Sequence, residues 1–290
     1  MHPMHRPILR WYADHARDLP WRRPEASAWS VLVSELMLQQ TPVARVLPVH
    51  EAWLARWPTP ATLAAEPSGE AVRAWGRLGY PRRALRLHAA AVAIVERFGG
   101  EVPDTYDELL TLPGVGDYTA AAVASFAFGR RHVVLDTNVR RVFARALAGV
   151  EFPAASLTRS ERDLATSVLP EDEETAATWA VAVMELGALV CTAAGPRCDD
   201  CPVADLCTWR AAGCPAYDGP PRRTQAWAGT DRQCRGRLMA VLREDHGPVH
   251  SSRLEAAWPQ DRDQRARCLD GLVADGLVRR TGRSSWALPT

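Results

Sequence analysis

The sequence predicts an all-α fold with one small mixed module near its end. Apolar residues recur at helical spacing through residues 1–212, and no segment there shows the alternation of a β-strand. Gly and Pro clusters separate the periodic segments, as they do between helices. The chain has 290 residues, of which 47% are hydrophobic, so it can form a substantial core in about two domains.

Two predicted helices open the chain, at Ile8–Ala16 and Trp29–Gln40, with the turn LPWRRP between them. The second is apolar almost all round, which indicates burial. Thr41 and Pro42 are typical of the N-cap and first turn of a helix that runs to about Trp57. Further helices are predicted at Leu63–Ala74, Arg82–Phe98, Ala120–Phe128 and Ala176–Val190.

A tight glycine turn joins two predicted helices in the segment LPGVGDYTA, residues 112–120. Gly114 and Gly116 permit backbone conformations that other residues resist, and they leave room for a ligand to approach. Backbone N–H groups at the start of the second helix form an anion site that reads no base sequence. The pattern favours a helix-hairpin-helix that clamps a DNA phosphate over a plain connection between helices.

Two carboxylates are candidates for catalysis. Glu35 falls in the middle of the buried helix, where burial raises the pKa of a carboxyl group and makes it a usable acid. Asp136 follows an apolar run and precedes a helix, so alone it is explained as an N-cap. An acid for the leaving group and a carboxylate that stabilises an oxocarbenium-like sugar are the two groups that glycosidic cleavage needs. In DNA the leaving group would be a base flipped out of the stack.

Composition excludes some classes of function. A net charge of +1 is not that of a strongly basic DNA-binding protein, so any DNA surface must be a local patch. All 35 residues counted as Lys+Arg are arginines, so no side-chain amine can form a Schiff base and a lysine-dependent lyase is excluded. No apolar run would span a membrane and no secretory signal precedes the first helix, so we expect a cytoplasmic protein.

Four of the seven cysteines share one short segment, which in a cytosolic chain argues for a metal site rather than for disulfides. Cys191, Cys198, Cys201 and Cys207 could hold a zinc ion or an iron–sulfur cluster. Zinc sites more often pair two CxxC knuckles, and only one CxxC is present, so the spacing favours a [4Fe-4S] cluster. The other cysteines, Cys214, Cys234 and Cys268, are expected to be ordinary thiols.

The last part of the chain differs in pattern. Residues 213–231 are rich in Pro and Gly and are predicted to be a linker. Residues 232–290 predict three short helices, the second with a capping box of Ser252 and Glu255, and then a terminal hairpin. This order predicts a small winged-helix-like module. Its hairpin arginines favour DNA binding, and a docking or packing role is an equal alternative.

Together these motifs resemble the endonuclease III superfamily of DNA glycosylases, and within it the MutY-type adenine glycosylases. Residues 8–212 carry, in the family's order, SELMLQQTPV, LGYPRRALRLH, LPGVGDYTAAAV, LDTNVRRV and the four-cysteine segment. The resemblance implies a two-lobed helix-hairpin-helix fold, with a six-helix lobe at 29–133 and a cluster lobe made of 1–28 and 134–212. It also implies a monomer that excises adenine opposite 8-oxoguanine or guanine from double-stranded DNA in base excision repair, and that is nucleoid-associated when bound to DNA.

The resemblance implies catalytic roles residue by residue. Glu35 would protonate adenine N7 and help to handle the attacking water, and Asp136 would stabilise the cationic sugar or a covalent sugar intermediate. Asn138 would orient the acid and the water. Tyr118 occupies the place where bifunctional relatives carry a nucleophilic lysine, which implies a monofunctional enzyme that leaves an abasic site.

The resemblance also implies DNA contacts. Gln40, Thr41 and Tyr80 match residues that fill or wedge the opened duplex near the oxidised guanine, where an aromatic ring can intercalate by stacking. Arg22 and Trp29 would line the base pocket. Typical members carry a Nudix-like domain that helps to recognise 8-oxoguanine, and here the linker is followed by the short module instead. That departure concerns the specificity for the opposite base rather than the glycosylase chemistry.

Three other functions are compatible with the sequence, and one is a DNA-binding regulator in which residues 232–290 alone would bind a defined sequence. A glycosylase of the same superfamily could act on thymine or uracil mispaired with guanine. A non-catalytic DNA-binding protein could scan DNA or sense redox state through the cluster, and Glu35 would then be dispensable.

Overall fold

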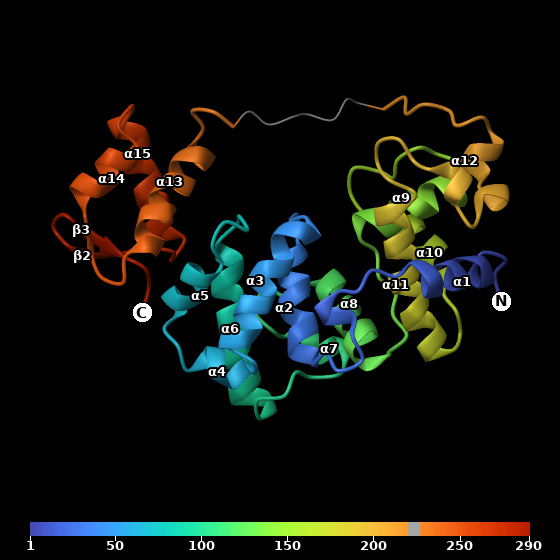
Figure 1. Cartoon of the computed structure of the whole chain (residues 1–290), viewed down its shortest axis with the longest axis horizontal. Coiled ribbons are helices and arrows are strands. Elements are labelled where there is room, and N and C mark those ends of the chain that lie inside the picture. The colour runs from blue at the N-terminus through green and yellow to red at the C-terminus, as the bar shows by residue number, and fades with distance from the viewer. Residues whose placement is uncertain (220–226) are drawn as a thin grey trace. The chain divides into compact units, whose positions relative to one another are not determined.

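The computed structural model describes residues 1–219 and 227–290, and Figure 1 shows the elements along the chain. The fold is helical, as predicted, and the described strands are three short ones near the end of the chain. Tertiary contacts divide the chain into two compact units. The predicted linker, 213–231, falls partly on residues 220–226, which lie outside the described residues.

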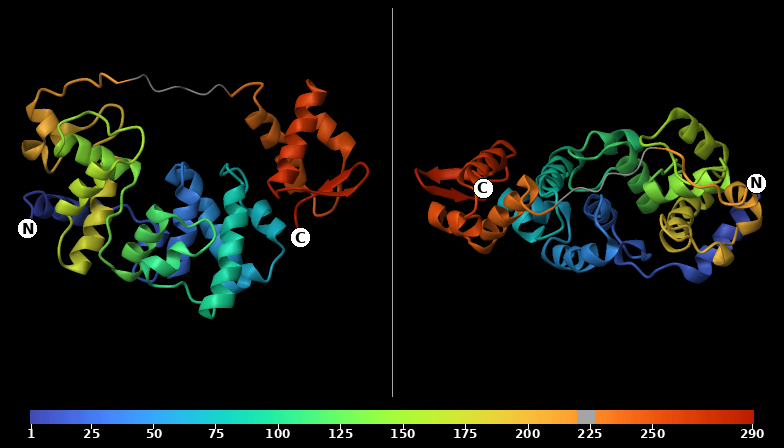
Figure 2. Two further views of the ribbon diagram at one scale, coloured as in Figure 1. Left: turned by 180° about the vertical axis from the view of Figure 1, so that it is seen from behind. Right: turned by 90° about the horizontal axis from the view of Figure 1, so that it is seen from above.

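The first unit contains residues 1–32, 104–111 and 115–221 and is built around one central helix. That helix is α11, and it is contacted by α1, α8 and α9 (Figure 2). The core between them includes Ile8, Phe143, Trp179 and Val183, all of them buried. The elements are α1 (His5–His15), η1 (Pro20–Arg22), α7 (Tyr106–Leu110), α8 (Asp117–Phe128), α9 (Thr137–Ala146), α10 (Arg159–Ser167), α11 (Glu173–Leu189), η2 (Cys198–Asp200), η3 (Ala204–Leu206) and α12 (Thr208–Ala211).

The second unit contains residues 33–103, 112–114 and 222–290. Its first helices are α3 (Val43–Arg56), α4 (Pro60–Ala64), α5 (Ser68–Ala74) and α6 (Arg82–Phe98), and α6 contacts both α4 and α5. Three buried tryptophans form an edge-to-face cluster, with ring centroids 4.7 Å apart for Trp53 and Trp57 and 5.9 Å apart for Trp53 and Trp75. Helix α2 (Ala28–Leu38) crosses from the first unit to the second after Leu32.

The end of the second unit has the predicted order of three helices and a hairpin. The helices are α13 (Asp231–Glu244), α14 (Ser251–Ala257) and α15 (Arg262–Ala274), and the strands are β1 (Val249–His250), β2 (Arg279–Gly282) and β3 (Ser285–Ala287). The strands form one antiparallel sheet in the order β1-β3-β2. Leu238, Leu254 and Leu272 bring one buried side chain from each helix to the core of this C-terminal module, residues 227–290.

Two local predictions about helix starts are wrong. The N-cap of α3 is Pro42, and the Thr41 hydroxyl instead donates to the carbonyls of Gln39 and Leu78, at 3.2 and 3.3 Å. The N-cap of α14 is His250, whose ring accepts from Ser252 N–H, so Ser252 lies inside the helix and forms no capping box with Glu255. The Thr41 hydroxyl is therefore engaged with carbonyls outside α3 and does not cap that helix. Helix α14 is capped by His250, which lies two residues before Ser252.

The predicted lobe boundaries stay a prediction. The contacts group residues 1–32 with 115–221, whereas the sequence suggested a lobe over 29–133.

Within the described residues, no helix has the length and apolar character needed to cross a membrane.

Candidate active site

The carboxylate of Asp136 is fixed at the start of α9. One oxygen, Oδ1, accepts from the backbone N–H of Val139 at 2.7 Å, so Asp136 is the N-cap that the sequence predicts. The other oxygen, Oδ2, accepts from the side-chain amide of Asn138, also at 2.7 Å. Burial raises the pKa of the Asp136 carboxyl, and the donors from Val139 and Asn138 oppose this shift because they favour the charged form. Two donors therefore hold the Asp136 carboxyl group in one orientation in a poorly solvated place.

A buried arginine fixes Asn138 in turn. Arg141 Nη2 donates to Asn138 Oδ1 at 2.8 Å and to the carbonyl of Gly187 at 2.6 Å, and its Nε donates to the carbonyl of Cys191 at 2.7 Å. Helices α9 and α11 approach closely here, since a Cβ added to Gly187 would lie 2.7 Å from Asn138 Cβ. The network thus links Asp136 to the first cysteine of the four-cysteine segment. The sequence prediction missed Arg141, which no local signal distinguishes from a surface arginine.

The glycine turn lies between α7 and α8, which contact each other as the hairpin pattern predicts. Gly114 has φ +81°, and a Cβ there would lie 2.6 Å from Arg86 Cβ, so only glycine fits. Gly116 is the N-cap of α8, and a Cβ there would point into open space. Tyr118, in the first turn of α8, packs against a buried cluster that includes Ala121 and so presents only part of its side chain.

The predicted pocket residues Arg22 and Trp29 lie in the first unit. Trp29 is buried. The Arg22 guanidinium lies 2.9 Å from the carboxylate of Glu185, which is fully buried in α11. Arg17 binds the same carboxylate through Nε and Nη2, each at 2.7 Å, and this lowers the pKa of Glu185 against the effect of burial. Two arginines therefore neutralise one buried carboxylate, and Arg22 is held in place by it.

Glu35 lies in α2 and only 4% of its surface is exposed, as the sequence predicts. It belongs to the second unit, whereas Asp136 belongs to the first, so their joint action is treated as a proposal. Thr41 is also buried, and Gln40 has φ +53°, a conformation that costs energy in any residue other than glycine. Tyr80 has φ +45° as well, and its ring is 50% exposed.

One buried arginine, Arg83, binds the backbone on both sides, at the turn that contains Gln40 and at the turn that contains Tyr80. Arg83 is 5% exposed, and its guanidinium donates to backbone carbonyls and to one hydroxyl. On one side the acceptors are the carbonyls of Leu36, Met37 and Gln39, at 2.9, 3.1 and 2.6 Å, and the hydroxyl of Thr41 at 3.0 Å. On the other side the acceptor is the carbonyl of Gly79 at 3.1 Å, directly before Tyr80.

These contacts explain how a cation can be buried at this place. The carbonyls of Leu36 and Met37 lie in the last turn of α2, where helix carbonyls have no partner within the helix and carry partial negative charge. Burial still lowers the pKa of Arg83 to about 10. Arg83 therefore caps the helix that carries Glu35 and fixes the turns that carry Gln40 and Tyr80. The sequence prediction missed this residue too.

Two of the four spaced cysteines, Cys191 and Cys207, contact Arg145. Arg145 Nη1 lies 3.5 Å from the Cys191 sulfur, and the Cys207 thiol lies 3.6 Å from the Arg145 carbonyl. Burial raises the pKa of Cys201 to about 11, and the neighbouring thiols of Cys191, Cys207 and Cys198 add to this shift. The four thiols are thus close enough to influence one another. Over residues 1–219 and 227–290, however, no three His, Cys, Asp or Glu side chains are placed to bind a single metal ion.

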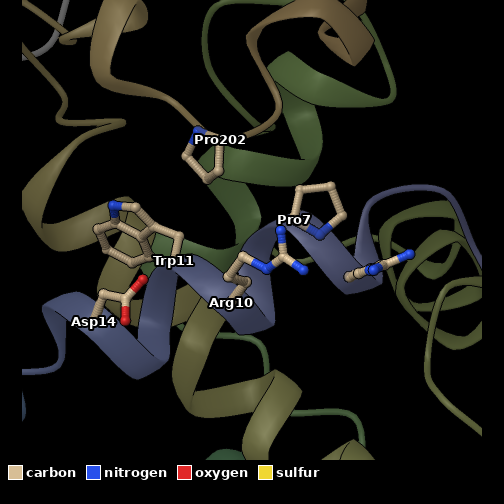
Figure 3. Close-up of a pocket in the computed structure, with 6 residues that line it drawn as sticks. Pro7, Arg10, Trp11, Asp14 and Pro202 are labelled. Atoms are coloured by element: carbon tan, nitrogen blue, oxygen red, sulfur yellow. The ribbon is translucent and has the colours of Figure 1, made fainter.

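An open pocket on the first unit contains none of the predicted residues. Figure 3 shows it between α1 and the cysteine segment, lined by Arg10, Trp11 and Asp14 of the helix and by Pro202. Its lining is mixed, with the apolar side chains of Trp11 and Pro202 beside the charged side chains of Arg10 and Asp14.

Comparison with known proteins identifies the family. The profile of the HhH-GPD superfamily of base excision DNA repair proteins matches residues 33–165. The adenine DNA glycosylase of Mycobacterium tuberculosis H37Rv is 54% identical over 97% of this chain and 92% of its own length, and that of Mycolicibacterium smegmatis is 54% identical over 97% and 94%. A solved structure described as a thermostable thymine-DNA glycosylase aligns with a TM-score of 0.64 and 26% identity, over 72% of this chain and 95% of that one.

The fold and the glycine turn define a helix-hairpin-helix protein of DNA repair. The chain belongs to the HhH-GPD superfamily, and within it to the MutY-type branch that its motifs resemble. The family assignment made from the sequence is therefore confirmed.

We predict that Arg83→Leu lowers the free energy of unfolding by about 3 kcal/mol, because several buried carbonyls lose their donor. The measurement is urea unfolding of the full chain. Arg82→Leu is the matched control, since Arg82 is the exposed neighbour in the same helix and makes one ion pair, 3.3 Å from Asp275. Equal effects of the two substitutions would contradict the role given to Arg83.

Proposed function

We propose that this protein is a DNA glycosylase that releases adenine mispaired with 8-oxoguanine or guanine. The observation that carries the proposal is the 54% identity to proteins named adenine DNA glycosylase, which extends over 97% of the chain. The rigid carboxylate of Asp136 and the buried acid Glu35 supply the chemistry that such a reaction needs. The substrate is double-stranded DNA, and the enzyme acts as a monomer in the cytoplasm, on the nucleoid.

The proposed mechanism divides the work between the two carboxyl groups. Glu35 donates its proton to N7 of the flipped adenine, which weakens the bond between N9 and the sugar C1′. As that bond breaks, both of its electrons leave with the base and positive charge develops on the sugar. Asp136 stabilises this charge, either through space or by a covalent bond to C1′. A water then adds to C1′, displacing the Asp136 carboxylate where that bond has formed, and it loses a proton to Glu35, which leaves an abasic site.

The environment of Asp136 suits the stabilisation of positive charge on the sugar. A negative charge in a poorly solvated place interacts strongly with a developing cation, because little water screens it. The donors from Val139 and Asn138 hold the carboxylate in one orientation, so the site needs little rearrangement during the reaction. Asn138 is a positioning residue for this carboxylate, and its own orientation depends on Arg141.

The reaction proposed here stops at the abasic site. Tyr118 stands at the position where bifunctional relatives carry a lysine, and the chain contains no lysine at all. Strand cleavage by a Schiff base would need such an amine.

The proposed DNA contacts follow the family pattern. The glycine turn binds a backbone phosphate through N–H groups near Gly114 and Gly116. Gln40, Thr41 and Tyr80 enter the opened duplex, and Arg22 and Trp29 line the base pocket. The strained backbone at Gln40 and Tyr80 supports this assignment, because such strain persists only where the surrounding structure enforces it.

We also propose that Cys191, Cys198, Cys201 and Cys207 hold a [4Fe-4S] cluster. Around a single zinc ion, with Zn–S near 2.3 Å, four sulfurs would lie about 3.8 Å apart. In a cluster each thiolate binds a different iron, so the thiolates stand further apart. The presence of a single CxxC among the four cysteines supports the cluster over a zinc site built from two such pairs. When bound, the cluster would cross-link this loop, and no step of base release depends on it here.

One alternative has a specific observation in its favour. The solved structure with a TM-score of 0.64 is described as a thymine-DNA glycosylase. Release of thymine from a mispair with guanine would use the same two carboxylates, so the two functions differ in the base released.

We predict that Asp136→Asn lowers the single-turnover rate of adenine release by about a hundredfold or more, because it removes a preorganised charge. Affinity for the mispair should change little, since asparagine also caps a helix. The matched control is Asp172→Asn, because Asp172 caps α11 through the N–H of Thr175 at 2.8 Å and is exposed. If Asp136→Asn lost binding together with activity, Asp136 would be structural instead.

We predict that the rate of adenine release falls as the solution is made acidic. The midpoint of this acid limb should lie above the ordinary aspartate pKa of about 3.9. The sign follows from burial, which raises the pKa of Asp136, so the required carboxylate is protonated at a higher pH than in a free aspartate. Asn138→Ala should move this acid limb to still higher pH, because it removes a donor to the carboxylate. Thr137→Ala, at an exposed neighbouring position, should leave the limb in place. A limb that Asn138→Ala does not move would refute the positioning role.

We predict that the purified protein has broad visible absorbance, and that Cys201→Ser abolishes it. Cys214→Ser is the control, because Cys214 lies near Cys198 but outside the spaced set. Iron and acid-labile sulfide analysis provides the measurement. A colourless protein with stoichiometric zinc would overturn the cluster assignment.

A further inference from the structure

The C-terminal module is fastened to helices α5 and α6 of its own unit. Arg243 of α13 donates from Nε to the carbonyl of Val72 at 3.0 Å, and burial lowers the pKa of Arg243 to about 10. Gly69 N–H donates to the carbonyl of Pro289 at 3.0 Å, and a Cβ at Gly69 would lie 2.2 Å from that oxygen. Asp275 pairs with Arg82 of α6 at 3.3 Å. The module is thus packed on this surface by backbone and side-chain contacts at several points.

This packing places an arginine of the module over the proposed wedge residue. The guanidinium carbon of Arg232, in the first turn of α13, lies 5.4 Å from the ring centroid of Tyr80. The same guanidinium lies 5.5 Å from the ring of Trp227, which is 53% exposed. Two exposed aromatic rings therefore flank one exposed cation. The guanidinium carbon of the buried Arg83 also lies near this ring, 5.7 Å from the Tyr80 ring centroid.

Arg232 retains its hydrogen-bonding capacity. A guanidinium over an aromatic ring still has its five N–H donors at its edge. Within residues 1–219 and 227–290, no carboxylate pairs with Arg232, whereas Arg82 and Arg235 are both paired with Asp275. Exposed aromatic rings beside free arginine donors are typical of surfaces that bind opened nucleic acid strands, through stacking and phosphate contacts.

The hairpin arginines are less available for DNA. Arg280 donates to the carbonyls of Gly282 and Arg283, at 3.0 and 2.7 Å, and lies over Trp286. Arg279 donates to the carbonyl of Leu288 at 3.3 Å. The side chains of Arg279 and Arg280 thus stabilise the hairpin itself and are less available for DNA than Arg232 at the start of α13.

We propose that Arg232 is a DNA-binding residue that contacts a backbone phosphate of the DNA strand opposite the excised adenine, next to the base that Tyr80 wedges. This inference rests on the proposed function and extends it to the C-terminal module. The module then contributes directly to recognition of the damaged strand. Stacking against Tyr80 and Trp227 holds the guanidinium in place before DNA binds, so little side-chain entropy is lost on binding.

The test combines Arg232→Ala with DNA that carries a neutral methylphosphonate beside the 8-oxoguanine. With the full-length chain and a non-cleavable adenine analogue opposite 8-oxoguanine, Arg232→Ala should weaken binding about tenfold, as expected for loss of a charged hydrogen bond. The methylphosphonate should weaken binding of the unmodified protein but not of the Arg232→Ala variant, because the two changes remove the same contact. Arg237→Ala removes an equal charge from an exposed site on the same helix and should have less than a twofold effect.

The outcomes separate this inference from the proposed function. Equal effects of Arg232→Ala and Arg237→Ala, or additive effects of the variant and the methylphosphonate, would overturn the contact. The affinity measurement requires no base release, so it judges the contact even if the unmodified protein releases a base other than adenine. If the unmodified protein released no adenine, the proposed function would be refuted. The affinity measurement would still decide whether Arg232 contacts the phosphate.

Discussion

The buried guanidinium of Arg83 is the interaction on which the second unit depends. A cation in a protein interior is stable only when acceptors surround it, and here nearly all of the acceptors belong to the backbone. They come from the end of α2 and from the turns at residues 39–41 and 78–80, so one side chain joins three segments. Because the helix end is satisfied in this way, α2 can be buried together with Glu35. Because both turns are tied down, Gln40 and Tyr80 keep backbone conformations that they would otherwise avoid.

Arg141 performs the corresponding task in the first unit. It binds the carbonyl of Gly187 in the last turn of α11, the side-chain carbonyl of Asn138 and the carbonyl of Cys191, so the side chain of Asp136 and the cysteine segment depend on one residue. A chain without lysine uses arginine at each such place. The choice has a physical reason, since the planar guanidinium presents several donors in fixed directions and an ammonium is a single compact charge. In this protein the arginines therefore organise the interior of both units.

The sequence predicted the features that local patterns encode. The burial of Glu35, the glycine turn, the N-cap role of Asp136 and the order of elements in the C-terminal module all follow from spacing within a few residues. Long-range partners could not be predicted in this way. Thr41 was expected to cap α3, but its hydroxyl binds the carbonyl of Leu78, far along the chain. Arg83 and Arg141 have no sequence signature that separates them from exposed arginines, and the docking of the module through Arg243 and Gly69 depends on surfaces that exist only after folding.

Single-turnover excision on a set of duplexes decides whether the two carboxyl groups release adenine from a mispair. The duplexes carry adenine opposite 8-oxoguanine, guanine or cytosine, and thymine opposite guanine, and alkali treatment afterwards reveals the abasic sites. The account predicts release of adenine, fastest opposite 8-oxoguanine, and no strand cleavage before alkali is added. Release of thymine alone would keep the carboxylate chemistry but contradict the adenine assignment. Tight binding without release of any base would contradict the catalytic account as a whole.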